Sequence, residues 1–142
     1  MSALARASQV LDDSTYARAA TAAAAFLKAK LYDPKQSTLN RRYRAGRAAV
    51  DGFLDNYAFL IQGLLDLYET SFDVQWLSWA VRLQDTQDEI FWDASQGTYF
   101  ATTNTDTSVL FRMRDVVHER YIPNKFLVLA DGAAGQKQIA RW

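Results

Sequence analysis

The chain has 142 residues, 49% of them hydrophobic and 13% aromatic, a composition typical of one globular domain and not of a disordered chain. Its sixteen basic and sixteen acidic residues cancel, so no overall charge favours nucleic acid or an anionic membrane as a partner. It has no cysteine and one histidine, which excludes disulfides, thiolate catalysis, cysteine-ligated zinc and His-rich metal sites within one chain.

The first residues carry charges at Arg6, Asp12 and Asp13 and no continuous apolar stretch, so they do not form a secretory signal. No apolar run in the chain approaches the roughly 20 residues needed to span a bilayer. We therefore expect a soluble intracellular protein of the cytoplasm, without a membrane partner.

The N-terminal third predicts two helices and a hairpin. Apolar residues in register predict a first helix over 2–11 and a second over about 15–31, and Asp13 or Ser14 can cap the second by accepting its free N–H groups. The run TLNRRYR at 38–44, followed by Ala45-Gly46, predicts a small strand or hairpin.

Two further helices of different character follow, at about 53–70 and 74–91. On the first, apolar residues fill two adjoining stripes and leave only a narrow polar line, so we expect this helix to be covered on more than one side; the line consists of Asp55, Gln62, Asp66 and Glu69. The second has one apolar face and one polar face, with Asp73 as its cap, which predicts an outer helix packed against an inner one.

The C-terminal part predicts mostly short extended elements. We expect a turn at 93–97, a strand at 98–102, a strand at 126–130 and a final helical turn at 136–142. The pattern at 108–118 fits a strand or a helix equally well. The whole predicts one mainly α domain over 1–142, organised as three parts: hairpin 2–31, hairpin 53–91 and a C-terminal extended segment 98–142. The two αα-hairpins would repeat at a spacing of about 40–50 residues.

The run DGFLDNYAFLIQGLLDLYE, followed by WLSWAVRLQDTQDEIFWD and QGTYF, resembles the helical domain of the spermatogenesis-associated protein 20 family. The resemblance implies an (α/α)-toroid with short β inserts, similar to N-acylglucosamine 2-epimerases and six-hairpin glycosidases. In that family a thioredoxin-like domain precedes the toroid.

The sequence departs from the family in three places. The thioredoxin-like domain and the first hairpins have no counterpart, and after residues 111–115 the text continues directly into a segment similar to the family's C-terminal end. Asp55-Asn56 stands where the family has paired aspartates. We therefore expect a shortened product or a fragment with two hairpins of a ring that needs about six.

Inner-helix ends line the central cavity of such a toroid, which makes Asp55 a candidate catalytic acid or base and Asn56 and Tyr57 candidate substrate-binding residues. The alternative for Asp55 is an interaction with the positive end of the helix, and the alternative for Tyr57 is the core. Trp92 and Tyr99 could stack on a sugar ring or simply pack. Arg112 could hold a substrate charge or lie on the surface.

Other charged groups suggest no site. Asp85, Asp88 and Glu89 are typical of a solvated helix face, and the loop 93–97 lacks the glycine and the closing glutamate of a calcium loop. The arginines of residues 35–47 indicate a solvated hairpin and not a nucleic-acid interface. His118 has no visible nucleophile beside it. We expect no metal and no cofactor.

Two functions of different class follow. One is a short form of a sugar-epimerase-like or glycosidase-like domain whose parent binds a carbohydrate-like small molecule, inactive alone because facing residues are absent. The other is a non-catalytic module that binds a protein partner or self-associates through an exposed inner-helix face at Leu60, Leu64 and Leu67.

Overall fold

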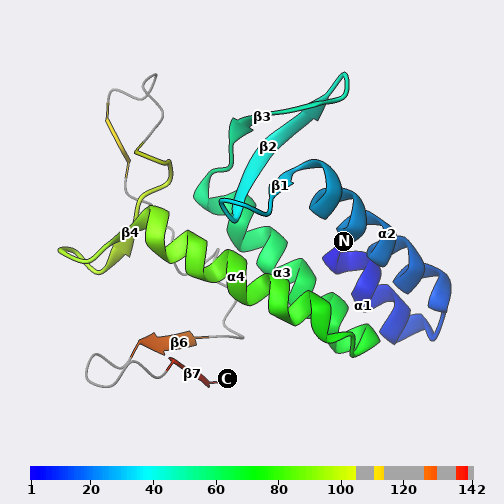
Figure 1. Cartoon of the computed structure of the whole chain (residues 1–142). Helices are drawn as coiled ribbons and strands as arrows, with labels where there is room; N and C mark the ends of the chain where they lie inside the picture. Colours follow the sequence, from blue (N-terminus) through cyan, green and yellow to red (C-terminus); the bar gives the residue numbers. More distant parts are fainter. Residues whose placement is uncertain (105–110, 114–126, 131–136, 141–142) are drawn as a thin grey trace.

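Four α-helices and short antiparallel strands make up the part of the chain that the computed structural model describes, residues 1–104, 111–113, 127–130 and 137–140 (Figure 1). In chain order the elements are α1 (Ser2–Leu11), α2 (Ser14–Lys30), β1 (Tyr32–Asp33), β2 (Thr38–Arg44), β3 (Arg47–Asp51), α3 (Leu54–Ser71), α4 (Val74–Phe91), β4 (Trp92–Asp93), β5 (Thr98–Tyr99), β6 (Leu127–Ala130) and β7 (Lys137–Ala140). The four predicted helices over 2–31 and 53–91, their order, and the strand at 38–44 with its turn at 45–46 are confirmed.

The inner helix α3 is buried on several sides, as its two apolar stripes predict. Leu64 and Leu67 are fully buried and Leu60 is only 7% exposed, because α4 covers one side of α3 while α1 and α2 cover others. The opposing α4 contributes Trp79, Leu83 and Phe91 to the same core. These contacts confirm the inner and outer roles of the two helices. The predicted exposed face at the three leucines is wrong.

The first hairpin packs against the second through small and apolar side chains. Ala5 of α1 and Ala20 and Ala24 of α2 are completely buried, which lets the helix backbones approach closely. The end of α2 also reaches α4, where Lys28 Nζ lies 5.4 Å from the centre of the Trp79 ring. Two helical hairpins packed together are therefore present, and the toroid implied by the resemblance stays a prediction.

The two hairpins are copies of one unit with a period of 60 residues, longer than the predicted 40–50. Each second helix begins after an aspartate cap, Asp13 or Asp73, whose side chain accepts the N–H of the residue two positions on. The residue before each cap has left-handed backbone, with φ 51° at Asp12 and 55° at Phe72. Asp12 and Phe72 are 60 positions apart, and so are the caps Asp13 and Asp73.

The repeat continues into the short β inserts. The register of β1 with β2 is Tyr32 opposite Leu39 and Asp33 opposite Thr38, and the register of β4 with β5 matches it 60 positions later: Trp92 opposite Tyr99 and Asp93 opposite Thr98. Both turns end on left-handed backbone, with φ 56° at Ser37 and 64° at Gly97. The same local chemistry thus builds the same unit twice.

Two predictions for the C-terminal part need correction. The strand predicted for 98–102 ends at Tyr99, because the next N–H groups bond elsewhere: Phe100 donates to Phe91 O and Ala101 to Met113 O. The helical turn predicted for 136–142 is wrong, since β7 pairs antiparallel with β6. So short a segment cannot nucleate a stable helix alone, whereas β6 offers it a ladder of backbone partners. The predicted strand at 126–130 is confirmed over residues 127–130 by β6, and residue 126 lies outside the described residues. The prediction for 108–118 lies mostly outside the described residues, and residues 111–113 form no helix or strand.

Candidate functional site

The residues at the start of α3 serve first to begin the helix. Asn56 Oδ1 accepts the backbone N–H of Phe53 at 2.9 Å, which fixes the first turn. Asp55 lies in that turn, where a carboxylate is favoured by the helix dipole. Its Oδ1 is buried, and within the described residues it has no hydrogen-bond partner. Asp55 thus combines a stabilising position with one unsatisfied buried oxygen.

Tyr57 is a core residue near the start of α3, and its side chain ends in a hydroxyl group. Its side chain is 1% exposed, meets the Phe91 ring edge-on at 5.5 Å and accepts the Leu39 N–H at 2.8 Å. Burial raises the pKa of the Tyr57 phenol, so the hydroxyl stays protonated at neutral pH and can still donate its hydrogen.

Trp92 and Tyr99 pack on each other across the β4–β5 turn. Their rings meet at 4.9 Å with an interplanar angle of 65°, and the Tyr99 hydroxyl donates to Asp88 Oδ1 at 2.6 Å. Burial, followed by that hydrogen bond, raises the pKa of Tyr99. Trp92 keeps 45% of its surface exposed. The pair is engaged in internal packing, the plainer of the two roles considered for it.

Arg112 donates hydrogen bonds to backbone carbonyls of two different segments. Its Nε and Nη2 donate to Thr102 O at 3.1 and 2.8 Å, Nη2 also reaches Ile90 O at 3.3 Å, and the guanidinium lies 4.0 Å from the centre of the Phe100 ring. Burial lowers the pKa of Arg112. These contacts tie the segment after β5 to the end of α4.

A small pocket lies at the N-terminal end of α3, and we call it the Tyr57 pocket. It measures about 250 Å³ and is lined by Gln36, Thr38, Leu39, Asp51, Tyr57, Ile90, Thr103 and Asn104. Of the six residues predicted for the site, Tyr57 alone lines it. The sequence missed the others because they come from separate parts of the chain: the β1–β2 turn, β2, the end of β3, the end of α4 and the segment after β5. No local sequence pattern joins these parts.

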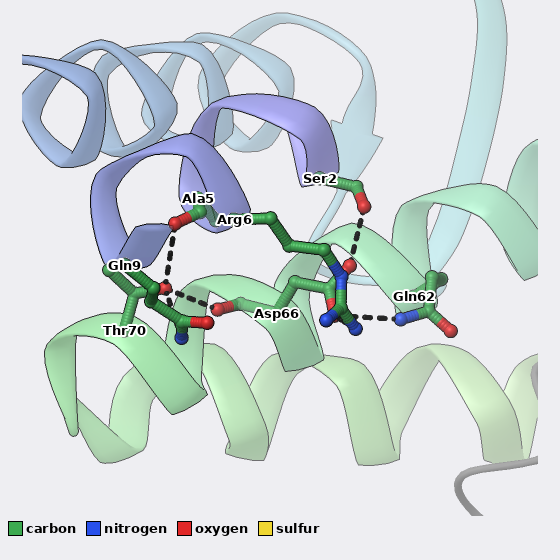
Figure 2. Close-up of polar contacts among 7 residues, drawn as sticks. All are labelled: Ser2, Ala5, Arg6, Gln9, Gln62, Asp66 and Thr70. Carbon is green, nitrogen blue, oxygen red and sulfur yellow. Dashed lines mark hydrogen bonds and ion pairs between the residues drawn. The ribbon is translucent and has the colours of Figure 1, made fainter. Parts of the chain in front are cut away.

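A second polar cluster lies between α1 and α3 and centres on Asp66 (Figure 2). The Asp66 carboxylate is 1% exposed and accepts hydrogen bonds from Ser2 Oγ at 2.5 Å, Arg6 Nη2 at 2.7 Å and Gln62 Nε2 at 2.9 Å. One turn on, Thr70 Oγ1 meets Asp66 O, Ala5 O and Gln9 Nε2, at 2.8, 3.2 and 2.9 Å. Asp66, one member of the predicted polar line of the inner helix, therefore faces α1.

The Asp66 cluster is a structural latch. A buried carboxylate that is ion-paired and multiply hydrogen-bonded holds two helices in register. A serine nucleophile would need a base with an available lone pair, whereas here Ser2 itself donates to a carboxylate that Arg6 and Gln62 also engage.

The described residues contain no group of three or more His, Asp or Glu side chains placed to hold a metal ion. Asp88 accepts from Gln84 and Tyr99, and Asp93 Oδ1 accepts from the N–H and Oγ of Ser95, so both carboxylates serve local structure. None of the helices in the described part of the chain combines the length and apolar character that crossing a bilayer requires.

Comparison with known proteins shows which proteins this chain is similar to. No family model matches it. It is similar to spermatogenesis-associated protein 20 of Rattus norvegicus (40% identity over 124 residues, 81% of this chain) and of Mus musculus (46% over 91 residues, 58% of this chain), and to the uncharacterised protein B0495.5 of Caenorhabditis elegans (42% over 74 residues, 52% of this chain).

The chain spans only 10–16% of the length of these relatives. The match to the rat protein nevertheless covers 81% of this chain. This chain is homologous to spermatogenesis-associated protein 20, at 40–46% identity over most of its length.

Proposed function

We propose that this chain forms part of a domain that binds a carbohydrate-like, hydroxyl-rich small molecule, and that the Tyr57 pocket is the binding site. The observation that carries the proposal is the lining of that pocket. Five residues with polar side chains line it together with Tyr57: Gln36, Thr38, Asp51, Thr103 and Asn104.

The chemistry of this lining suits a polyol. Sugar hydroxyls both donate and accept hydrogen bonds, and the pocket offers carboxylate and amide acceptors together with amide and hydroxyl donors. Leu39 and Ile90 add apolar wall for the C–H faces of a ring. At about 250 Å³ the pocket is smaller than the roughly 300–1,000 Å³ of most ligand sites, so it fits a single sugar ring or an open polyol.

We infer that this chain alone binds its ligand without turnover. Glycoside chemistry requires two carboxyl groups facing one bond. Asp51 is the one carboxylate among the residues that line the Tyr57 pocket, and Asp55, the predicted acid or base, does not line it. Catalysis in a longer relative would therefore draw its second group from elsewhere in that protein.

Ligand-observed NMR with a panel of aldoses, N-acylated sugars and linear polyols tests the proposal. We expect at least one compound to bind, and Asp51→Asn to weaken that binding about tenfold, since a hydrogen bond to a charged group is lost. Asp85→Asn, on the exposed face of α4, is the matched control and should leave binding unchanged. Absence of binding across the panel, or equal weakening by both variants, would contradict the proposal.

A second candidate function is partner binding through the part of α3 that stays accessible. Phe59 is 57% exposed, and it lines a groove of about 470 Å³ beside the start of α1. An aromatic side chain at such a groove is typical of an interaction site. Size-exclusion chromatography with light scattering tests self-association there. A monomer whose mass does not change with concentration would exclude it.

A further inference from the structure

The β2–β3 hairpin carries a group of arginines outside both of the sites considered above. Arg42, Arg44 and Arg47 are exposed, and none of them lines the Tyr57 pocket or the groove beside Phe59. We call these three residues the arginine face. Figure 1 shows the tip of the hairpin projecting beyond the helices.

The alternation of side chains along a strand places the three arginines on one side of the hairpin. Tyr43, between Arg42 and Arg44, packs against α2, where its ring meets the Phe26 ring edge-on at 5.8 Å. Neighbouring residues of a strand point to opposite faces, so Arg42 and Arg44 point away from α2. Arg47 lies directly opposite Arg44 and therefore shares its face.

The pairing of two arginines is unfavourable for the hairpin itself. Arg44 and Arg47 flank a two-residue turn, Ala45-Gly46, in which both residues have left-handed backbone, with φ 48° and 80°. Such a turn holds its flanking residues directly opposite each other, and like charges in that position destabilise the strand pair. Within the described residues, no ion pair involves any of the three arginines. A bound anion would reduce their repulsion.

The side chains of this face suit carboxylates in particular. Every basic residue of β2 and β3 is an arginine, and a guanidinium group binds a carboxylate through two parallel hydrogen bonds. Asp51 is the one acidic residue of the two strands, and it lies opposite Asn40 at the far end of the hairpin, where it lines the Tyr57 pocket. Ala49, opposite Arg42, is too small to cover the arginine.

We propose that the arginine face binds an extended, acidic segment of a partner protein that carries carboxylates at alternate positions. Arg42 and Arg44 are two residues apart in one strand, a separation of about 6.5 Å. Alternate side chains of an extended segment have the same spacing and point to one side. Two of its carboxylates can therefore meet Arg42 and Arg44 together, with Arg47 beside the second.

Single-stranded nucleic acid is the competing anionic partner, and the hairpin suits it less well. Proteins that bind single strands stack the bases on aromatic rings in addition to holding the phosphates. Tyr43 is the one aromatic residue of β2 and β3, and it faces α2 and not the arginine face. The equal numbers of basic and acidic residues also provide no overall attraction for a polyanion.

Fluorescence anisotropy with the full chain and three labelled probes tests the proposal. The probes are a short peptide of alternating glutamate and threonine, the same peptide with glutamine in place of every glutamate, and an oligothymidylate of equal length. We expect the glutamate peptide to bind saturably and to bind more weakly as salt is added, because exposed ion pairs are screened. The glutamine peptide should not bind, and the oligothymidylate should bind less tightly than the glutamate peptide.

Two double variants with the same change in net charge locate the site. Arg42→Gln with Arg44→Gln should weaken binding of the glutamate peptide at least about tenfold, because two charge-assisted contacts are lost. Arg18→Gln with Arg82→Gln removes two exposed arginines from α2 and α4 and should leave binding unchanged. Thermal unfolding should give the hairpin variant a Tm no lower than that of the control variant, because the hairpin loses a repulsion.

No saturable binding of the glutamate peptide, tighter binding of the oligothymidylate, or equal weakening by the two double variants would overturn the proposal. A hairpin variant with a lower Tm than the control variant would also overturn it, because the arginines would then serve the fold. The proposal goes beyond the functions proposed above and fails separately from them. Sugar binding is measured at the Tyr57 pocket, and self-association is read from the mass in solution.

Discussion

At the scale of single residues, Asp66 shows how a polar side chain in an apolar helix acquires its role. In the sequence it is one of four residues in a narrow polar line. In the structure its carboxylate is 1% exposed and accepts from Ser2, Arg6 and Gln62, two of them on α1 (Figure 2). A buried charge is tolerated only when paired and hydrogen-bonded, so this cluster sets the position of α1.

Arg6→Ala should lower the free energy of unfolding by about 1–2 kcal/mol, because it removes the cation from a buried carboxylate. The expected cost is moderate because the Arg6 side chain is 49% exposed. Urea denaturation measures it. Arg18→Ala, on the exposed face of α2, should change stability by less than about 0.5 kcal/mol. Equal effects of the two variants would contradict a latch role for Asp66.

Tyr57 and Tyr99 should make the protein less stable in alkali. Burial raises the pKa of both phenols above the ordinary 10.0, so above that pH the unfolded chain loses protons that the folded chain keeps. Stability is then fully present below about pH 10 and falls as the pH rises beyond it. Urea unfolding at about pH 9 and about pH 11 measures the fall. Tyr99→Phe should make it shallower, and an unchanged slope would argue against this origin.

At the scale of elements, the repeat of 60 residues arises from local signals that occur twice. Each outer helix starts after an aspartate cap, and each ends in a two-residue strand that pairs back across a turn. The aspartate at the start of each turn, Asp33 or Asp93, accepts the N–H two residues on. Such side-chain bonds to backbone donors define turns and helix starts without help from the core.

The caps Asp13 and Asp73 should contribute to stability independently and in an acid-sensitive way. Hydrogen bonds from Thr15 and from Gln75, respectively, lower the pKa of each below the ordinary 3.8. Their contribution is therefore present above about pH 4 and is lost as the pH falls through the lower native pKa. Alanine at either position should lower the Tm, and the double variant should show the sum.

Asparagine at the same two positions serves as the control for charge. It keeps the cap oxygen, so the Tm at neutral pH should stay close to that of the unaltered chain. The acid dependence at that position should disappear. A Tm drop as large as that of the alanine variants would show that the charge, and not the hydrogen bond, stabilises the helix.

Gly52, between β3 and α3, is a position where a side chain does not fit. A Cβ there would lie 2.7 Å from Leu39 O, which also accepts the Gly52 N–H. Since a backbone carbonyl cannot move aside cheaply, Gly52→Ala should cost about 1–3 kcal/mol in urea denaturation. NMR shifts should change at Leu39 and Tyr57. A cost below about 0.5 kcal/mol would mean that β2 can shift freely.

At the scale of the whole molecule, burial is concentrated in the second hairpin. In α3 most of the leucines, Tyr57 and Asp66 are buried, whereas in α1 Ala5 is the one buried residue. The first hairpin thus covers the second, and its position depends on the Asp66 latch and on the buried side chains of Ala5, Ala20 and Ala24. We therefore expect the first hairpin to be locally less stable than the second.

Amide hydrogen exchange should be slowest in the middle of α3 and fastest, among the four helices, in α1. Opening α1 exposes little apolar surface, while opening α3 exposes the core. Exchange followed by NMR or mass spectrometry measures the difference. Arg6→Ala should speed exchange further in α1 and leave the centre of α4 unaffected. Equal protection of α1 and α3 would show one cooperative unit instead.

Much of this fold is predictable from sequence because its signals are local. The helix bounds at 2–11 and 74–91, the cap at Asp73 and the turn at Ala45-Gly46 depend on residues within a few positions of each other. The same locality explains the errors. The final segment is a strand because a partner strand is available. The period of 60 is carried by short caps and turns, and the apolar periodicity of the helices does not record it.

The sequence by itself determined the four helices α1 to α4, which of them is inner, and that α3 carries one narrow polar line. Tertiary structure alone decided what that line faces, and it brought Gln36, Asp51, Tyr57 and Thr103 to one pocket. The physical reason is that hydrogen bonds and apolar periodicity within a helix act over a few residues. Contacts such as Arg6 to Asp66, 60 residues apart, depend on the rotation and offset of one helix on another, which no local pattern records.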